Sequence, residues 1–135
     1  MAEGSASDAF DRVKVYLLDI GVSITEENEA EELFVVEDEA NGIKNLVVDC
    51  EAPIVVLEQL IMEAPENGDF YRRLLQINRT LVHGAFVLDG EGQRVFFRDT
   101  LQLENLDPNE LEGSVRALSL AMAENADELL QFARG

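Results

Sequence analysis

Apolar residues along this chain change their spacing several times, and each change marks an expected element. The first of them recur at helical spacing, at Phe10, Val13, Leu17 and Ile20. Gly21 follows directly, and glycine is the residue that most often ends a helix in a left-handed conformation. The pattern therefore predicts a first helix that ends near residue 20.

Three apolar runs come next, after an acidic segment, Glu26–Glu32, that we expect to be a solvated loop. Leu33–Asp38 and Ile43–Cys50 are predicted strands, joined by a hairpin turn at residues 40–42. The third run, Ile54–Met62, is ambiguous. Its β-branched start after a proline favours a strand, whereas its second half alone would fit a helix.

The second half of the chain predicts a helix over Phe70–Leu81, a hairpin of two strands, and a last helix. The hairpin strands are Gly84–Leu88 and Val95–Leu103, and two glycines lie in the turn between them. Asp107 suits the cap of the last helix, because proline follows it and glutamate stands three positions on. The prediction is an α+β fold with a five-stranded, mainly antiparallel sheet and three helices, in the order α-β-β-β-α-β-β-α. We expect a disordered N-terminus at residues 1–6 and a single domain at 7–135.

Composition narrows the class of partner. The 135 residues are 47% hydrophobic, which suits one globular domain, and the formal net charge is −18. Such a charge repels nucleic acids and anionic membranes, so neither is an expected partner. Residues 1–65 hold sixteen acidic and three basic residues, against twelve and seven in 66–135. The run Glu26–Glu39 has eight acids and no base. It is interpreted first as a solvated surface and, as the alternative, as an electrostatic guide for a basic client segment.

Candidate catalytic chemistry is sparse. His83 is the only histidine and Cys50 the only cysteine, so neither has a partner for a metal shell or a nucleophile–base pair. No phosphate-binding loop or serine elbow occurs. The sequence predicts no enzyme, no cofactor and no metal. With neither a signal-peptide pattern nor a spanning segment, a cytoplasmic location is expected.

The chain has more apolar surface than one layer of helices needs. The run Ile54–Met62 is apolar at both parities, and the helix over Phe70–Leu81 carries a second stripe beside its first. Either the helices wrap the sheet fully, or a second subunit or a bound chain covers the rest. The second alternative is favoured, because exposed apolar patches usually mark interfaces.

Three local motifs resemble the type III secretion chaperones (the Tir-chaperone family) and their YbjN-like relatives. Leu74–Asn78 (LLQIN) resembles the end of the leucine-rich helix of that family, and Gly84–Asp89 with Gly92 resembles the hairpin that follows it. Leu101–Leu103 with Leu106–Leu111 resembles the entry to its last helix. The resemblance covers the second half well and the first half only in pattern.

The resemblance implies a non-enzymatic, chaperone-like protein-binding module that holds an extended client segment on apolar sheet and helix surface. The alternative is a YbjN-like regulatory or scaffolding protein that binds a folded partner. A homodimer is also implied, built around the second helix and the last two strands. By analogy the client would contact Phe34, Val35, Val55 and Leu57. The dimer interface would include Tyr71, Leu75, Asn78, Val82 and Phe96.

Overall fold

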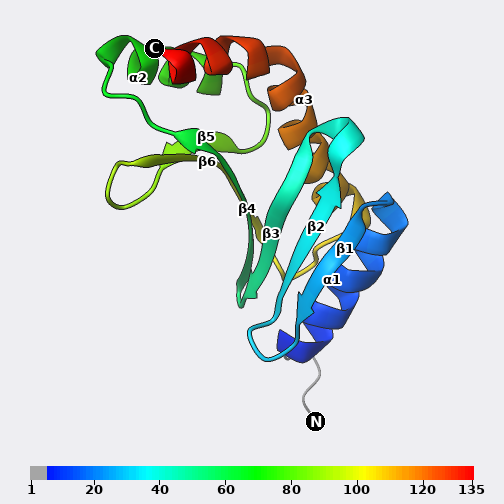
Figure 1. Ribbon diagram of the computed structural model, residues 1–135. Helices are drawn as coiled ribbons and strands as arrows, with labels where there is room; N and C mark the ends of the chain where they lie inside the picture. The colour runs from blue at the N-terminus through cyan, green and yellow to red at the C-terminus, as the bar shows by residue number, and fades with distance from the viewer. Residues whose placement is uncertain (1–5) are drawn as a thin grey trace.

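A computed structural model describes residues 6–135 and shows a twisted antiparallel sheet with helices packed on one face (Figure 1). The sheet has six strands in the order β1-β2-β3-β4-β6-β5. The helices are α1 (Ala6–Ile20), α2 (Gly68–Asn78) and α3 (Pro108–Arg134). The strands are β1 (Ser23–Asn28), β2 (Leu33–Asp38), β3 (Ile43–Glu51), β4 (Ile54–Glu63), β5 (Ala85–Leu88) and β6 (Arg94–Gln102). The disordered N-terminus predicted at 1–6 lies outside the described residues, except for Ala6, which begins α1.

The predicted sheet of five strands is wrong by one strand, because β1 occupies part of the acidic segment expected to be a loop. Glu26 lies opposite Val35 of β2, and Glu27 lies opposite Phe34. β1 is an edge strand, and most of its side chains are exposed to solvent. Backbone pairing with β2 does not require apolar side chains, so the sequence pattern gave no strand signal here. The element order is therefore α-β-β-β-β-α-β-β-α.

The ambiguous third run is a strand, and its two apolar parities face opposite sides of the sheet. Val55 and Leu57 lie in the core that the helices cover. Val56 is also buried, yet it does not belong to that core. The apolar residues of β4 therefore divide between the core face of the sheet and the opposite face.

The helix predicted over Phe70–Leu81 is present as α2, which begins two residues earlier and ends three residues earlier, and the predicted start of the last helix at Asp107 is confirmed. The side chain of Asn67 accepts a hydrogen bond from the backbone N–H of Asp69 at 2.9 Å, ahead of α2. Asp107 and Glu110 form a reciprocal capping box, with N···O distances of 2.8 and 3.1 Å, and Pro108 begins α3. These contacts satisfy backbone N–H groups that a helix start otherwise leaves unpaired.

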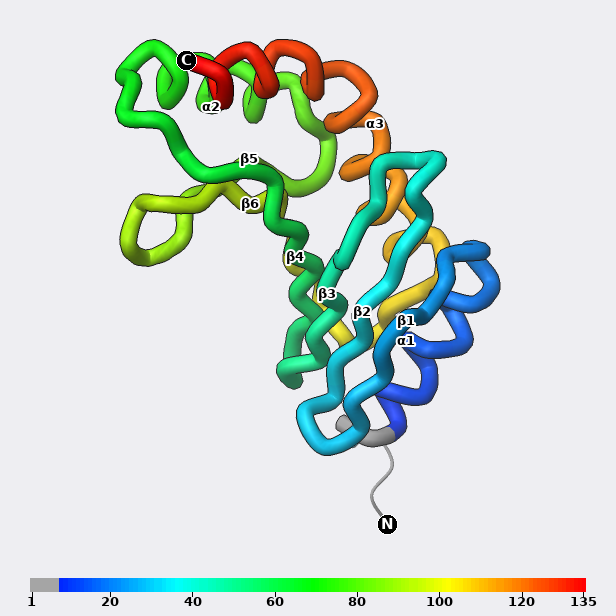
Figure 2. Tube along the Cα trace, viewed as in Figure 1, coloured from blue at the N-terminus to red at the C-terminus, as the bar shows by residue number. Residues whose placement is uncertain are grey.

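The core is built at two places along the sheet. At one, α1 packs on the first strands, where the rings of Phe10 and Phe34 stack with centroids 4.3 Å apart. At the other, α2 meets the end of α3, where Phe70 and Phe132 pack edge to face at 5.3 Å. The tube view shows β4 and β6 curving away from β1–β3 to reach this second place (Figure 2). No helix of residues 6–135 covers the opposite face of the sheet, which we call the open face.

Candidate functional site

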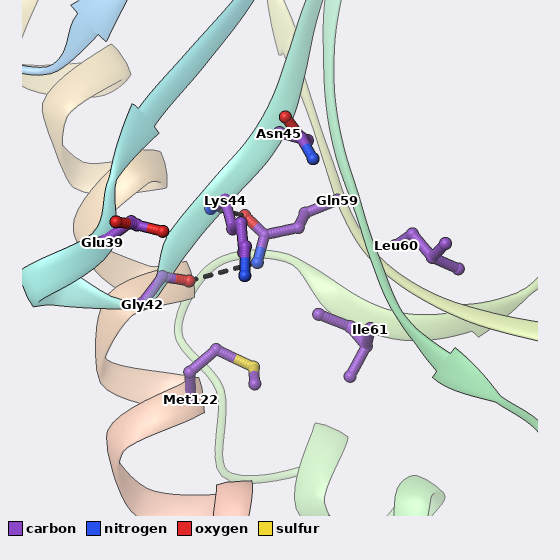
Figure 3. A pocket seen from close by; sticks show the side chains of 8 residues that line it. All are labelled: Glu39, Gly42, Lys44, Asn45, Gln59, Leu60, Ile61 and Met122. Carbon is purple, nitrogen blue, oxygen red and sulfur yellow. Dashed lines mark hydrogen bonds between the residues drawn. The ribbon is translucent and has the colours of Figure 1, made fainter.

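The β3–β4 ladder breaks partway along both strands and leaves a fork. The last paired residues are Val47 of β3 and Glu58 of β4, whereas β4 pairs with β6 as far as Glu63. Beyond the break, the side chain of Gln59 makes the hydrogen bonds that backbone pairing would otherwise make. Its Oε1 accepts from the backbone N–H of Lys44 at 3.0 Å, and its Nε2 donates to the carbonyl of Gly42 at 3.1 Å (Figure 3). Within residues 6–135, the edge of β4 beyond Gln59 therefore has no strand partner on the β3 side.

A cavity of about 450 Å³ occupies this fork. Ile61 and Met122 point toward each other across it, and Leu60 points away (Figure 3). A second, mostly apolar cavity of about 230 Å³ continues along the C-terminal half of α3 and shares Ile61 and Met122 with the first. We call the two together the fork groove. Its residues are Glu39, Gly42, Lys44, Asn45, Gln59, Leu60, Ile61, Met62, Met122, Ala126, Leu129, Leu130 and Ala133.

A second exposed apolar region lies on α2 and the turn after it. Leu75 is 72% exposed and Val82 is 88% exposed, and Leu120 of α3 is 59% exposed. Val82 and Leu120 both line a cavity of about 250 Å³, together with His83. We call Leu75, Val82 and Leu120 the α2 patch.

The other predicted dimer-interface residues are placed differently. Asn78 fastens the end of α2 to β5, because its amide group donates to the carbonyl of Phe86 at 3.0 Å and accepts from the N–H of Phe86 at 2.8 Å. Tyr71 is half-buried and packs against Phe70 with ring centroids 5.6 Å apart. Phe96 is half-buried on the open face, opposite Leu60 of β4. Asn78 therefore holds α2 against β5 within one protomer.

Three of the four predicted client-binding residues lie inside the protomer. Phe34, Val55 and Leu57 are buried in the core beneath the helices. Only Val35 faces the open side of the sheet, where it lies opposite Val47. The apolar run of β2 contains both Phe34 and Val35, and the sequence does not fix which of the two points inward. Of the four residues predicted to contact a client, only Val35 therefore lies where a client could reach it.

The open face combines aliphatic and acidic side chains in rows across the strands. Directly opposed residues of an antiparallel sheet share a face, so the pairing register defines each row. One row runs Glu26, Val35, Val47, Glu58 and Arg98, and the next runs Asn28, Leu33, Asp49, Val56 and Thr100. Arg98 forms an ion pair with Glu58 at 2.9 Å.

Asp49 is the most perturbed carboxyl group on this face. Its pKa is raised from 3.8 to about 6, first by partial burial and then by a side-chain hydrogen bond with Glu51 and the negative charges of Glu51 and Glu31. A carboxyl group in such surroundings holds its proton into the mildly acidic range.

The two isolated residues with nucleophilic or acid–base potential do not converge on a site. Cys50 is buried, and burial raises the pKa of its thiol to about 12, helped by the charges of Glu32 and Asp49. A thiol with so high a pKa is a poor nucleophile at neutral pH. His83 is exposed and lines the same cavity as Val82 and Leu120. Among the described residues, no group of three or more histidine, cysteine, aspartate or glutamate side chains could hold a metal ion.

Sequence reasoning missed Gln59 and Met122. Gln59 is buried in an otherwise apolar run, and its parity is that of the core residues Val55 and Leu57. A polar residue at a core parity signals that a buried backbone group needs a partner, and this could have been noticed. Nothing in the sequence brings Met122 to the fork, because its position depends on the path of α3.

The fold with its open face defines a chaperone-type α+β domain. Residues 6–135 match the CesT_Tir_1 family model, and the chain belongs to that family. The type III secretion chaperone-like resemblance drawn from the sequence is thereby confirmed. No curated protein sequence matches the chain.

Two solved structures share the fold at low sequence identity. E. coli YbjN, for which a role in transcription regulation has been suggested, has a TM-score of 0.65 and 14% identity, and the match covers 88% of this chain and 92% of that one. The HopA1–SchA chaperone–effector complex has a TM-score of 0.63 and 13% identity, and the match covers 87% and 94%. Of the helices in residues 6–135, none is long and apolar enough to cross a membrane.

Proposed function

We propose that this protein is a non-enzymatic, dimeric, chaperone-like module of the cytoplasm that holds an extended client segment in the fork groove. The observation that carries the proposal is the unpaired edge of β4 beyond Gln59, which lies beside an apolar groove. An extended chain can add to such an edge through backbone hydrogen bonds, while alternate side chains enter the groove. Neither contact requires the client to be folded.

The groove has the chemistry of a tolerant binding surface. Met122 and Met62 contribute flexible, polarisable side chains, which adapt to differently shaped apolar partners. Leu130, on the α3 wall, is 50% exposed and gives a client further apolar contact. Backbone pairing would supply register, and apolar burial at roughly 25 cal/mol per Å² would supply most of the affinity.

Variants on the exposed wall of the groove test this proposal. Leu130→Asp should weaken binding of an extended client peptide at least tenfold, because it places a charge beside the apolar cavity. Leu18→Asp is the matched control, since Leu18 is 56% exposed on α1 and outside the groove. The client is first captured from native lysate and identified by mass spectrometry. Its tiled peptides are then titrated by fluorescence anisotropy.

A second measurement isolates the strand edge. Peptides N-methylated at alternate residues lose backbone donors without losing side chains. One methylation register should abolish binding, and the other should leave it intact. Equal binding of both registers, or equal binding by Leu130→Asp and the wild type, would show that the client lies elsewhere.

The α2 patch supports the homodimer. Three large aliphatic side chains, Leu75, Val82 and Leu120, are more than half exposed in the protomer, and a second copy would remove them from water. Light scattering after gel filtration should give about twice the 15.0 kDa of the chain. Leu75→Asp should return the mass to that of a monomer, and a monomeric wild type at micromolar concentration would refute this part of the proposal.

The alternative is a YbjN-like regulatory or scaffolding protein that binds a folded partner. The α2 patch favours it, because Leu75 lies on α2, Val82 on the segment that follows α2 and Leu120 on α3, so the patch offers side chains without a free strand edge. Under this alternative, Leu75→Asp would abolish partner binding and Leu130→Asp would leave it unchanged.

A further inference from the structure

We propose that the open face of β1–β4 docks a basic segment of a partner protein in which Lys or Arg side chains alternate with aliphatic ones. The aliphatic side chains would cover Val35 and Val47, and the cations would pair with the carboxylates around them. The inference rests on the proposed function only in that the partner is a protein chain, and it concerns the face of the sheet opposite the helices.

The pairing register sets aliphatic and acidic positions side by side on this face. Val35 and Val47 are directly opposed, with Glu26 on one side and Glu58 on the other. In the next row, Asp49 lies between Leu33 and Val56. Glu37 and Glu51 fall on the same face, because each stands two residues beyond Val35 and Asp49 along its strand. The face therefore presents short aliphatic strips bounded by carboxylates.

Most of these carboxylates have no cation of their own. Glu58 is paired with Arg98. For Glu26, Glu37, Asp49 and Glu51, no basic side chain in residues 6–135 comes within ion-pair distance. A basic segment would supply the missing charges, whereas an acidic or purely apolar segment would leave them crowded together.

The surroundings of Asp49 support a cationic occupant. Leu33 and Val56, its neighbours on β2 and β4, carry no charge, and the charged groups that act on it are Glu51 of β3 and Glu31 of the β1–β2 turn. Burial and these negative charges hold the pKa of Asp49 at about 6. A lysine or arginine placed nearby would lower that pKa, so binding near pH 6 should release protons.

Synthetic peptides test the chemistry directly. The probe alternates lysine and valine, and two controls alternate glutamate with valine and lysine with serine. The Lys/Val peptide should bind, the Glu/Val peptide should not, and the Lys/Ser peptide should bind more weakly. Calorimetry near pH 6, in two buffers of different ionisation heat, should show proton release for the Lys/Val peptide. Binding without proton release, or equal affinity for Lys/Val and Lys/Ser, would overturn the proposal.

Charge-neutral variants locate the surface. Glu26→Gln and Glu51→Gln should each weaken the Lys/Val peptide by about two- to fivefold, the range that exposed ion pairs contribute. Asp127→Asn, on exposed α3, is the matched control and should not change the affinity. Asp49→Asn should bind the peptide but release no protons. If Asp127→Asn weakens binding as much as Glu51→Gln, the attraction is general charge and the proposal fails.

Binding of the Lys/Val peptide to the open face can be tested separately from binding of the client peptide to the fork groove. Leu130→Asp should leave the Lys/Val affinity unchanged while it weakens the client peptide. If Leu130→Asp abolishes both, the basic segment lies in the fork groove and the open-face proposal fails, whereas the proposed function stands. If Glu51→Gln lowers only the Lys/Val affinity and the client peptide does not bind at all, the open-face proposal stands and the proposed function fails.

Discussion

Replacing Asp49 by asparagine should stabilise the protein above pH 6, and the gain should vanish in acid. The folded protein raises the pKa of this carboxyl group from 3.8 to about 6, so between these values the native state holds a proton that the unfolded chain has lost. Ionisation therefore costs stability, and the free energy of unfolding falls as the pH rises through this window. A shift of this size corresponds to an upper limit of about 3 kcal/mol. The side chain is only partly buried, so solvent screening reduces our expectation to about 1–2 kcal/mol.

The assay is urea denaturation of the wild type and Asp49→Asn at several pH values from 4 to 8, with the difference between the two curves as the readout. Many other carboxylates titrate in the same range, and the difference removes their shared contribution. It should be smallest at pH 4, where the native carboxyl group is neutral and the unfolded one is only about half ionised, and should reach its full value above pH 6. A difference that does not change with pH would refute the reasoning, because it would show a packing effect in place of a proton linkage.

Three further predictions concern single side chains. Asp107→Ala removes the side-chain acceptor of the Glu110 N–H from the capping box and should cost about 0.5–2 kcal/mol of stability, measured by thermal denaturation; an unchanged midpoint would contradict the role of this cap. Gln59→Leu leaves the carbonyl of Gly42 and the N–H of Lys44 without their partner and should cost about 1–3 kcal/mol, with increased amide exchange at the start of β3; unaltered exchange there would show that the side chain does not hold the fork together. Cys50→Ala and His83→Gln should leave client binding unchanged, because neither side chain reaches a second reactive group; loss of binding by a folded variant would argue for chemistry at that residue.

Local signals in the sequence predicted much of the fold. Residues 33–38 were predicted as a strand and form β2 with the same bounds, because turn residues flank a β-branched core. Asp107 was predicted as a helix cap for the same kind of reason, since the cap, the proline and the glutamate lie within four residues. β1 was missed because its pairing depends on β2 and leaves most of its side chains in water.

The candidate sites were less predictable, because they depend on contacts between residues far apart in the chain. Phe34 and Val35 are both apolar, and only the position of α1 decides that Phe34 enters the core. The fork depends on the left-handed backbone of Asn45, with φ of 54°, and on the side chain of Gln59 crossing to β3. Neither feature leaves a periodic pattern in the sequence.

The two outer edges of the sheet, β1 and β5, both oppose strand pairing between copies of the chain. β1 ends one side with exposed glutamates at positions 26 and 27, and β5 ends the other side with only four residues. Copies of the chain that approached edge to edge through β1 would bring like charges together, and those meeting through β5 would gain few backbone hydrogen bonds. Acid that neutralises the glutamates would remove the first barrier. Growth into sheets shared between molecules, and from there into fibrils, should therefore begin at β1 and at low pH.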